Sequence, residues 1–297
     1  MLDEVPNSRS LAIDGLELSC WEQGEGPVVL LLHGFPDSPQ TWRLALPALA
    51  KAGFRAVAVT IPGYEQSSIR TGKPKVRDFS SLNLARIVEA VVDQLSSEPI
   101  HLVGHDWGAS LVFSAARLCP QKVRSLTMMS VPHPARFFRF MFANSDQRKA
   151  SRYIQFFQLV GIAEYALRRN DFGGIKKLWD RWSPGLQGSE EYLAPVLEQF
   201  ARREVLTAAL CYYRAAALPG DSQSKALIRG HVDVPTLGMY GEHDGCILPR
   251  TFRACMNEDD FTGGLTVEAV ADAGHFLHLE QPDSCHRLLV EHLKKHS

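Results

Sequence analysis

The segment VGHDWGASLVFSA, residues 103–115, constrains the fold more than any other part of the chain. Two glycines, Gly104 and Gly108, flank Asp106 between an apolar run and the start of a predicted helix. Small residues there allow a sharp turn from strand to helix, which lifts the central side chain above a sheet. Aspartate is also a common helix cap, so a structural role stays open. The position favours a nucleophile, whereas Ser110 lies inside the predicted helix and is not expected to react.

Apolar runs on both sides of this turn predict a mostly parallel sheet. Such runs, continuous and rich in β-branched residues, are typical of strands that are covered on both faces. They lie at 27–34, 55–63, 99–104, 123–131, 234–241 and 265–270. An Asp-Gly pair inside LAIDGLELSCW (11–21) predicts an antiparallel hairpin at the start. Segments with helical spacing, such as 82–97, are expected to cover the sheet.

The strand pattern is interrupted once. Residues 133–230 hold no convincing strand and are rich in Phe, Tyr, Arg and helix-forming residues. We therefore expect a core domain formed by 1–132 and 231–297, with 133–230 inserted as a helical cap, or lid. The alternation of strands and helices in the core predicts an α/β fold with right-handed crossovers.

Composition excludes several classes of function. The chain has 297 residues, with 32 basic and 33 acidic residues and no block of like charge, so a nucleic-acid partner is not expected. The start, MLDEVPNSRS, does not resemble a secretory signal, and no apolar run approaches the roughly 18 residues of a membrane span. We expect a soluble, cytoplasmic protein with a small-molecule partner. Six dispersed cysteines without a Cys-x-x-Cys pair predict buried thiols rather than a metal site.

A catalytic carboxylate at position 106 needs a base and a group that orients the base. In this fold class they follow the nucleophile in the order acid, then histidine, at the carboxyl ends of strands. Asp244 and His275 each follow a predicted strand and fit that order. Glu242 and Asp233 are rival carboxylates, while the loop after the 123–131 run has none.

An oxyanion hole is expected beside the turn. It requires the amide after the nucleophile and one amide from the loop after an early strand. By position these are the amides of Trp107 and of Phe35 in HGFPDS, residues 33–38.

Together, these segments resemble the motifs of α/β-hydrolase fold epoxide hydrolases along nearly the whole chain. The matching motifs are HGFP (33–36), PGY with SS shortly after (62–68), GHDWGA (104–109), GEHD (241–244) and GHF (274–276). The resemblance implies an α/β-hydrolase fold: a mostly parallel sheet with an antiparallel start, helices on both faces and an inserted cap. It also implies Asp106 as nucleophile, His275 as base and Asp244 as its partner, with the Phe35 and Trp107 amides as the oxyanion hole.

The same resemblance implies two proton-donating tyrosines in the cap. YIQFFQLVGIAE offers Tyr153 and ALCYYRA offers Tyr213, with Tyr212 as the alternative one position away. These tyrosines, Trp107 and Phe35 are expected to contact an apolar epoxide. A carboxylate is ionised at neutral pH and can attack a saturated carbon, so the product would be a vicinal diol formed through an aspartyl ester. No cofactor or metal is required.

Haloalkane dehalogenases share most of these motifs, and a haloalkane or haloacid dehalogenase is therefore the alternative. In that case Trp107 and either Trp179 or Trp182 would bind the halide. A non-catalytic ligand-binding protein on the same fold is a third hypothesis, because folds do not fix functions. The sequence leaves open which epoxide is used, its stereochemistry, the physiological role and whether the protein is a homodimer.

Overall fold

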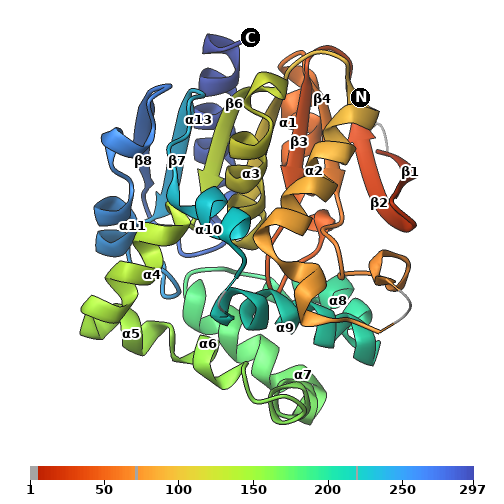
Figure 1. Cartoon of the computed structure of the whole chain (residues 1–297), viewed down its shortest axis with the longest axis vertical. Coiled ribbons are helices and arrows are strands. Elements are labelled where there is room, and N and C mark those ends of the chain that lie inside the picture. Colours follow the sequence, from red (N-terminus) through yellow and green to blue (C-terminus); the bar gives the residue numbers. More distant parts are fainter. Residues whose placement is uncertain (1–5, 71–72, 219) are drawn as a thin grey trace.

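The computed structural model describes residues 6–70, 73–218 and 220–297 (Figure 1). Its strands form one sheet in the order β1-β2-β4-β3-β5-β6-β7-β8. The strands are β1 (Asn7–Ile13), β2 (Leu16–Gln23), β3 (Val28–Leu32), β4 (Arg55–Val59), β5 (Ile100–His105), β6 (Val123–Met129), β7 (Thr236–Gly241) and β8 (Leu265–Val270). The pairs β1–β2 and β2–β4 are antiparallel, and all others are parallel. The predicted sheet, with its antiparallel start, is confirmed.

The first hairpin follows from its turn residues. Asp14 and Gly15 have φ values of 47° and 75°, and Ile13 pairs with Leu16. Two left-handed residues in succession form the tight turn whose twist matches antiparallel strands. The Asp-Gly prediction is therefore confirmed.

Alternation along the parallel strands creates two apolar layers. In β3, Leu30 and Leu32 belong to one buried cluster, while Val29 and Leu31 belong to the other. Successive strand residues point to opposite faces, so such a strand must be covered on both sides. Helices α2 (Ser81–Leu95) and α3 (Trp107–Leu118) contribute to the first cluster, and α1 (Ala45–Lys51) and α13 (Pro282–Lys295) contribute to the second.

The chain between β6 and β7 is helical. Its helices are α4 (Pro134–Ala143), α5 (Ser145–Ala150), α6 (Arg152–Phe156), α7 (Ile162–Trp182), α8 (Ser189–Phe200), α9 (Arg203–Ala217) and α10 (Ser222–Arg229). No strand occurs among the described residues of 133–230, as predicted. Helices α5 to α9 lie together at one end of the sheet (Figure 1). Two further helices, α11 (Pro249–Cys255) and α12 (Leu277–Glu280), follow β7 and β8.

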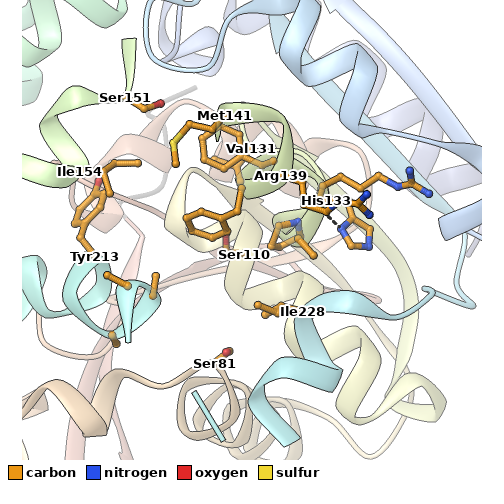
Figure 2. A pocket seen from close by; sticks show the side chains of 18 of the residues that line it. Ser81, Ser110, Val131, His133, Arg139, Met141, Ser151, Ile154, Tyr213 and Ile228 are labelled. Carbon is orange, nitrogen blue, oxygen red and sulfur yellow. Dashed lines mark hydrogen bonds between the residues drawn. The ribbon is translucent and has the colours of Figure 1, made fainter. Parts of the chain in front are cut away.

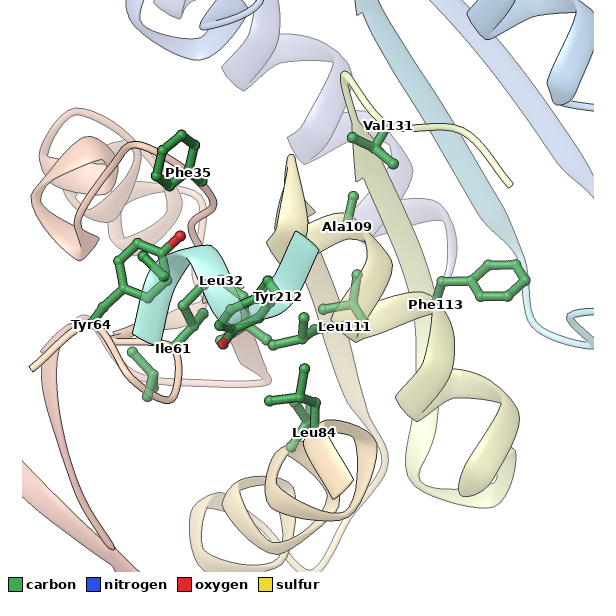
Figure 3. Close-up of a cluster of buried hydrophobic side chains, with 14 of the residues drawn as sticks. Leu32, Phe35, Ile61, Tyr64, Leu84, Ala109, Leu111, Phe113, Val131 and Tyr212 are labelled. Carbon is green, nitrogen blue, oxygen red and sulfur yellow. The ribbon is translucent and has the colours of Figure 1, made fainter. Parts of the chain in front are cut away.

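Helix α9 packs onto the core through its apolar face. Tyr212 belongs to the same buried cluster as Leu32, Leu84 and Leu111. Figure 3 shows the four side chains converging from α9, β3, α2 and α3. This packing fixes α9 above the turn that carries Asp106.

All six cysteines are buried free thiols, as predicted. Among the described residues, no helix combines the length and apolar character needed to span a membrane. The prediction that the start of the chain is not a secretory signal rests on residues 1–10. Residues 1–5 of that segment lie outside the described residues.

Candidate active site

Asp106 sits at a strained turn between β5 and α3. Its φ and ψ are 52° and −119°, a backbone conformation that non-glycine residues rarely adopt. A Cβ on Gly108 would lie 2.1 Å from the Leu32 carbonyl oxygen, and one on Gly104 would lie 2.3 Å from the backbone of Gly108. The flanking glycines are therefore required by close backbone approach. The Asp106 side chain makes no capping hydrogen bond to α3, so a helix cap does not explain it.

The Asp106 carboxylate points at two different partners. Its Oδ1 accepts the Phe35 amide at 2.8 Å, and its Oδ2 lies 3.3 Å from Nε2 of His275. A Cβ on Gly34 would lie 2.4 Å from Cβ of Asp106 and 2.7 Å from the Trp107 amide nitrogen. The loop after β3 thus packs directly against the turn. This packing brings the Phe35 amide to the Asp106 carboxylate and places the Trp107 amide beside Gly34.

His275 connects Asp106 to Asp244. Its Nδ1 lies 2.9 Å from Oδ2 of Asp244, whose Oδ1 accepts the amides of Cys246 and Ile247 at 2.7 and 3.0 Å. Burial alone would lower the pKa of His275, but the charge of Asp244 and hydrogen bonds to Asp106 and Asp244 outweigh it and raise that pKa.

The His275 backbone is held as firmly as its ring. Nε2 of His105 and the hydroxyl of Ser130 donate to the His275 carbonyl at 2.9 and 2.6 Å. The His275 amide donates to the Trp182 carbonyl at 3.0 Å. Sequence reasoning gave His105 no specific role, and its side chain helps to fix the position of the imidazole.

The rival residues lie elsewhere. Glu242 and Asp233 are exposed, and Thr262 donates a hydrogen bond to Asp233. Ser110 lies in the first turn of α3 and lines the pocket described below, but both nitrogens of His275 face aspartates. The His275 imidazole is therefore not available to Ser110 as a base.

A large pocket opens above Asp106. Its volume is about 850 Å³, and Asp106, Trp107, Tyr153 and Tyr213 contribute to its wall. Figure 2 shows apolar side chains such as Val131, Met141, Ile154 and Ile228 around it. The Phe35 ring does not line this pocket, because it is buried against the rings of Phe157, Phe200 and Tyr213.

The two predicted tyrosines converge in this pocket. Their ring centroids lie 5.8 Å apart, with Tyr153 on α6 and Tyr213 on α9. The Tyr213 hydroxyl is buried without a hydrogen-bond partner among the described residues, and the Tyr153 hydroxyl lies 3.3 Å from Sγ of Cys246. Burial raises the pKa of both phenols well above the ordinary value, and the nearby Asp106 charge adds to the effect. Both therefore stay protonated at neutral pH. The Cys246 contact was not predicted.

The aromatic alternatives have other roles. Tyr212 donates its hydroxyl to the Pro62 carbonyl at 2.7 Å, and the indole of Trp179 donates to the Pro36 carbonyl at 2.8 Å. Trp182 packs edge-on against His275, with centroids 5.2 Å apart. None of the three lines the pocket.

One buried group has side chains of the kind that bind metals. Asp37, His105 and His278 place one potential ligand atom each within 4.8 Å of the others. Nδ1 of His105 lies 3.9 Å from Oδ2 of Asp37, whereas two ligands of a tetrahedral zinc are expected roughly 3.4 Å apart. This pair of atoms is therefore spaced more widely than two ligands of a bound zinc. Sequence spacing gave no sign of this cluster, because its members come from three distant segments.

Comparisons with known proteins identify the family. The model of the alpha/beta hydrolase fold family matches residues 27–282, so the chain belongs to that family. Epoxide hydrolase 3 of Xenopus tropicalis is 30% identical over 274 residues, which cover 91% of this chain and 72% of that protein. The AB hydrolase superfamily protein YfhM of Bacillus subtilis (strain 168) is 30% identical over 278 residues, 91% of each chain.

Solved structures agree with this assignment. A Bacillus megaterium epoxide hydrolase in complex with an inhibitor has a TM-score of 0.82 and 25% identity, covering 96% of this chain and 100% of that one. An epoxide hydrolase from an endophytic Streptomyces has a TM-score of 0.80 and 26% identity, with coverage of 98% and 96%. The α/β-hydrolase fold predicted from the motifs is confirmed.

Proposed function

We propose that the protein is an epoxide hydrolase that converts apolar epoxides to vicinal diols through an ester on Asp106. The observation that carries the proposal is one pocket with a carboxylate at its base and two protonated phenols in its wall. The names of the similar proteins support the same activity.

In the first step, Oδ2 of Asp106 attacks an epoxide carbon and the carbon–oxygen bond of the ring breaks. Oδ1 is the less available oxygen, because it accepts the Phe35 amide. The leaving oxygen would become an alkoxide, which is unfavourable in an apolar pocket. Tyr213 or Tyr153 donates a proton to it, and the other phenol donates a hydrogen bond. The result is a hydroxyalkyl ester and a phenolate.

In the second step, His275 takes a proton from water and the resulting hydroxide attacks the ester carbonyl carbon. The amides of Phe35 and Trp107 stabilise the negative charge that develops on Oδ1. The diol oxygen leaves with the proton held by His275, and the proton of the regenerated carboxyl group restores the phenol. Esterification removes the Asp106 charge that helps to raise the pKa of His275, so the imidazole releases its resting proton to solvent and enters this step as a neutral base. It regains that proton when the Asp106 carboxylate is restored. Asp244 orients the imidazole throughout.

The domain assignment belongs to the same proposal. Residues 133–230 form the cap, which supplies both tyrosines, and 1–132 with 231–297 form the core, which supplies the other catalytic groups. The proposed location is the cytoplasm, and the proposed partner is a small-molecule substrate, an apolar epoxide. A homodimer stays a prediction.

Dehalogenation is not favoured. A halide site needs a second N–H donor facing the pocket beside Trp107, but the Trp179 indole binds the Pro36 carbonyl and Trp182 does not line the pocket.

A single turnover in oxygen-18 water tests the mechanism. With enzyme in excess over a terminal aromatic epoxide, the water oxygen should appear in the peptide that contains Asp106, and the diol should carry unlabelled oxygen. Label in the diol alone, or failure to hydrolyse a broad set of epoxides, would contradict the proposal.

A further inference from the structure

Cys246 lies where the loop after β7 meets helices α5 and α6. Its side chain is fully buried, two residues beyond Asp244. Its amide donates to Oδ1 of Asp244 at 2.7 Å, and its carbonyl accepts a hydrogen bond from the Gln147 side chain at 2.9 Å. The backbone of Cys246 is therefore fixed on both sides, and its Sγ lies 3.3 Å from the hydroxyl oxygen of Tyr153.

Neighbouring rings hold the Tyr153 side chain in place. Its ring packs against Phe157, Trp182 and Tyr213, with centroid distances of 5.4, 5.0 and 5.8 Å. The freedom that remains is rotation of the hydroxyl hydrogen about the C–O bond, so this hydrogen can point to Sγ or into the pocket. Tyr153 lines the pocket, whereas Cys246 does not. Cys246 can therefore act on a bound substrate through Tyr153.

The thiol of Cys246 keeps its proton at neutral pH. Burial raises the pKa of this thiol well above its ordinary value, and the charges of Asp244 and Asp106 add to the effect. A protonated thiol is a weak donor and a weak acceptor of hydrogen bonds. Its S–H group is buried and needs an acceptor.

One arrangement of the pair satisfies both hydrogens. Among the described residues, Sγ of Cys246 forms a hydrogen bond with the Tyr153 hydroxyl alone. The phenol hydrogen, by contrast, can turn to an acceptor inside the pocket, either water or a substrate oxygen. If the O–H pointed at Sγ, the buried S–H would have no acceptor. The S–H therefore donates to the phenol oxygen, and the O–H faces the pocket.

This arrangement favours epoxide opening. The Tyr153 oxygen becomes more negative when it gives a hydrogen bond or a proton to the leaving oxygen. The S–H bond stays intact, and its hydrogen faces that negative charge. Hydrogen bonds to an ionised acceptor are stronger than those to a neutral one, so the contact strengthens as the epoxide opens.

We infer that Cys246 is a positioning residue for epoxide opening: its thiol donates to the Tyr153 oxygen, turns the phenol hydrogen toward the substrate and stabilises the charge that develops on that oxygen. The inference rests on the proposed epoxide hydrolase activity. Because the Cys246 amide also holds Asp244, one residue fixes the Tyr153 hydroxyl relative to the triad.

Substitution of the thiol tests this role. In a single turnover with styrene oxide, Cys246→Ala should slow formation of the Asp106 ester by about fivefold, the effect of one weak hydrogen bond. Cys246→Ser keeps a donor and should return the rate to within about twofold of the unmodified protein. Hydrolysis of the ester should change by less than about twofold in both variants, because the backbone amide still holds Asp244. Stopped-flow tryptophan fluorescence resolves the two steps.

A double-mutant cycle separates this role from packing. In the background of Tyr153→Phe, Cys246→Ala should change the rate of ester formation by less than about 1.5-fold, because the thiol has lost its acceptor. The control is Cys285→Ala, which removes another buried thiol, one that donates to the Leu277 carbonyl, and should leave both rates unchanged. An equal loss with and without the Tyr153 hydroxyl, or no loss in either background, would overturn the inference.

A spectroscopic test does not need turnover. The infrared S–H stretch of Cys246 is identified as the band that is lost in Cys246→Ala. A donated hydrogen bond lowers the frequency of an S–H stretch, so this band should move to higher frequency in Tyr153→Phe. An unmoved band would overturn the inference even if the protein hydrolyses epoxides. If the band moves but the unmodified protein hydrolyses no epoxide, the proposed function fails and the inference fails with it, although the hydrogen bond exists.

Discussion

Tyr212 and Tyr213 are adjacent in α9, yet their hydroxyl groups have opposite surroundings. The Tyr212 hydroxyl donates to the Pro62 carbonyl at 2.7 Å and is part of the contact between α9 and the core. The Tyr213 hydroxyl has no partner among the described residues and lines the pocket above Asp106. One residue of helix turns a side chain by roughly 100°, which is enough to separate a structural phenol from a proton donor.

This difference predicts distinct effects of removing each hydroxyl. Tyr213→Phe should slow formation of the Asp106 ester by about a hundredfold, because the leaving oxygen loses a proton donor. Tyr212→Phe should leave that rate nearly unchanged and lower the free energy of unfolding by about 1 to 3 kcal/mol, because it leaves a buried carbonyl without its partner. Stopped-flow tryptophan fluorescence and chemical denaturation measure the two effects. The opposite assignment of effects would mean that Tyr212 is the donor.

The sequence could predict those site residues whose position is set by the order and direction of the strands. Asp106, Asp244 and His275 each follow a parallel strand, and the carboxyl ends of parallel strands meet at one edge of the sheet. Their proximity in the structure therefore follows from the strand pattern and the order along the chain.

Contacts that depend on side-chain packing could not be predicted in the same way. The choice between Tyr212 and Tyr213 requires knowing which face of α9 packs on the core. The sequence pattern does not show this, because the two tyrosines are adjacent and chemically identical. The Tyr153–Cys246 contact joins residues 93 positions apart through packing of the segment between β6 and β7 on the core. His105 belongs to the GHDWGA motif, but its bond to the His275 carbonyl depends on the folded sheet.

Loss of the base should trap the proposed ester. His275→Gln should still react once with an epoxide but hydrolyse the product about a thousandfold more slowly, because no group removes the proton from water. Intact-protein mass spectrometry should then show an adduct of the substrate mass. Asp106→Asn is the control and should form no adduct. Rapid multiple turnover by His275→Gln would rule out this role.

Gln147 should stabilise the contact between α5 and residues 246–248, which follow β7. This segment carries Cys246, the residue that contacts the Tyr153 hydroxyl. The buried Gln147 side chain on α5 donates to the Cys246 carbonyl at 2.9 Å and accepts the Leu248 amide at 3.0 Å. Gln147→Leu would leave both backbone groups unpaired and should lower the free energy of unfolding by about 2 to 4 kcal/mol. Chemical denaturation measures it, with Gln155→Leu, at an exposed position of α6, as the control. Equal stability of both variants would mean that the hydrogen bonds of Gln147 to residues 246–248 do not stabilise the protein.

Asp37 should make stability depend on pH. Burial raises the pKa of its carboxyl to about 7. Its Oδ2 has no hydrogen-bond partner among the described residues. The facing His105 gives no ion pair at 3.9 Å, because burial lowers the pKa of that imidazole to about 3. The charged form of Asp37 is therefore less stable inside the protein than in the unfolded chain.

The sign of the effect follows from proton binding. Between about pH 4 and about pH 7 the folded state keeps the Asp37 proton and the unfolded state loses it, so the free energy of unfolding falls as pH rises. A pKa change of this size corresponds to a loss of up to about 4 kcal/mol, complete above pH 7. Asp37→Asn cannot ionise and should lack this part of the pH dependence. Urea denaturation at about pH 5 and about pH 8 measures the difference. The control, Asp180→Asn at an exposed position, should behave like the unmodified protein. If Asp37→Asn loses as much stability between the two pH values as the unmodified protein does, Asp37 is ionised throughout and the neutral buried carboxyl is excluded.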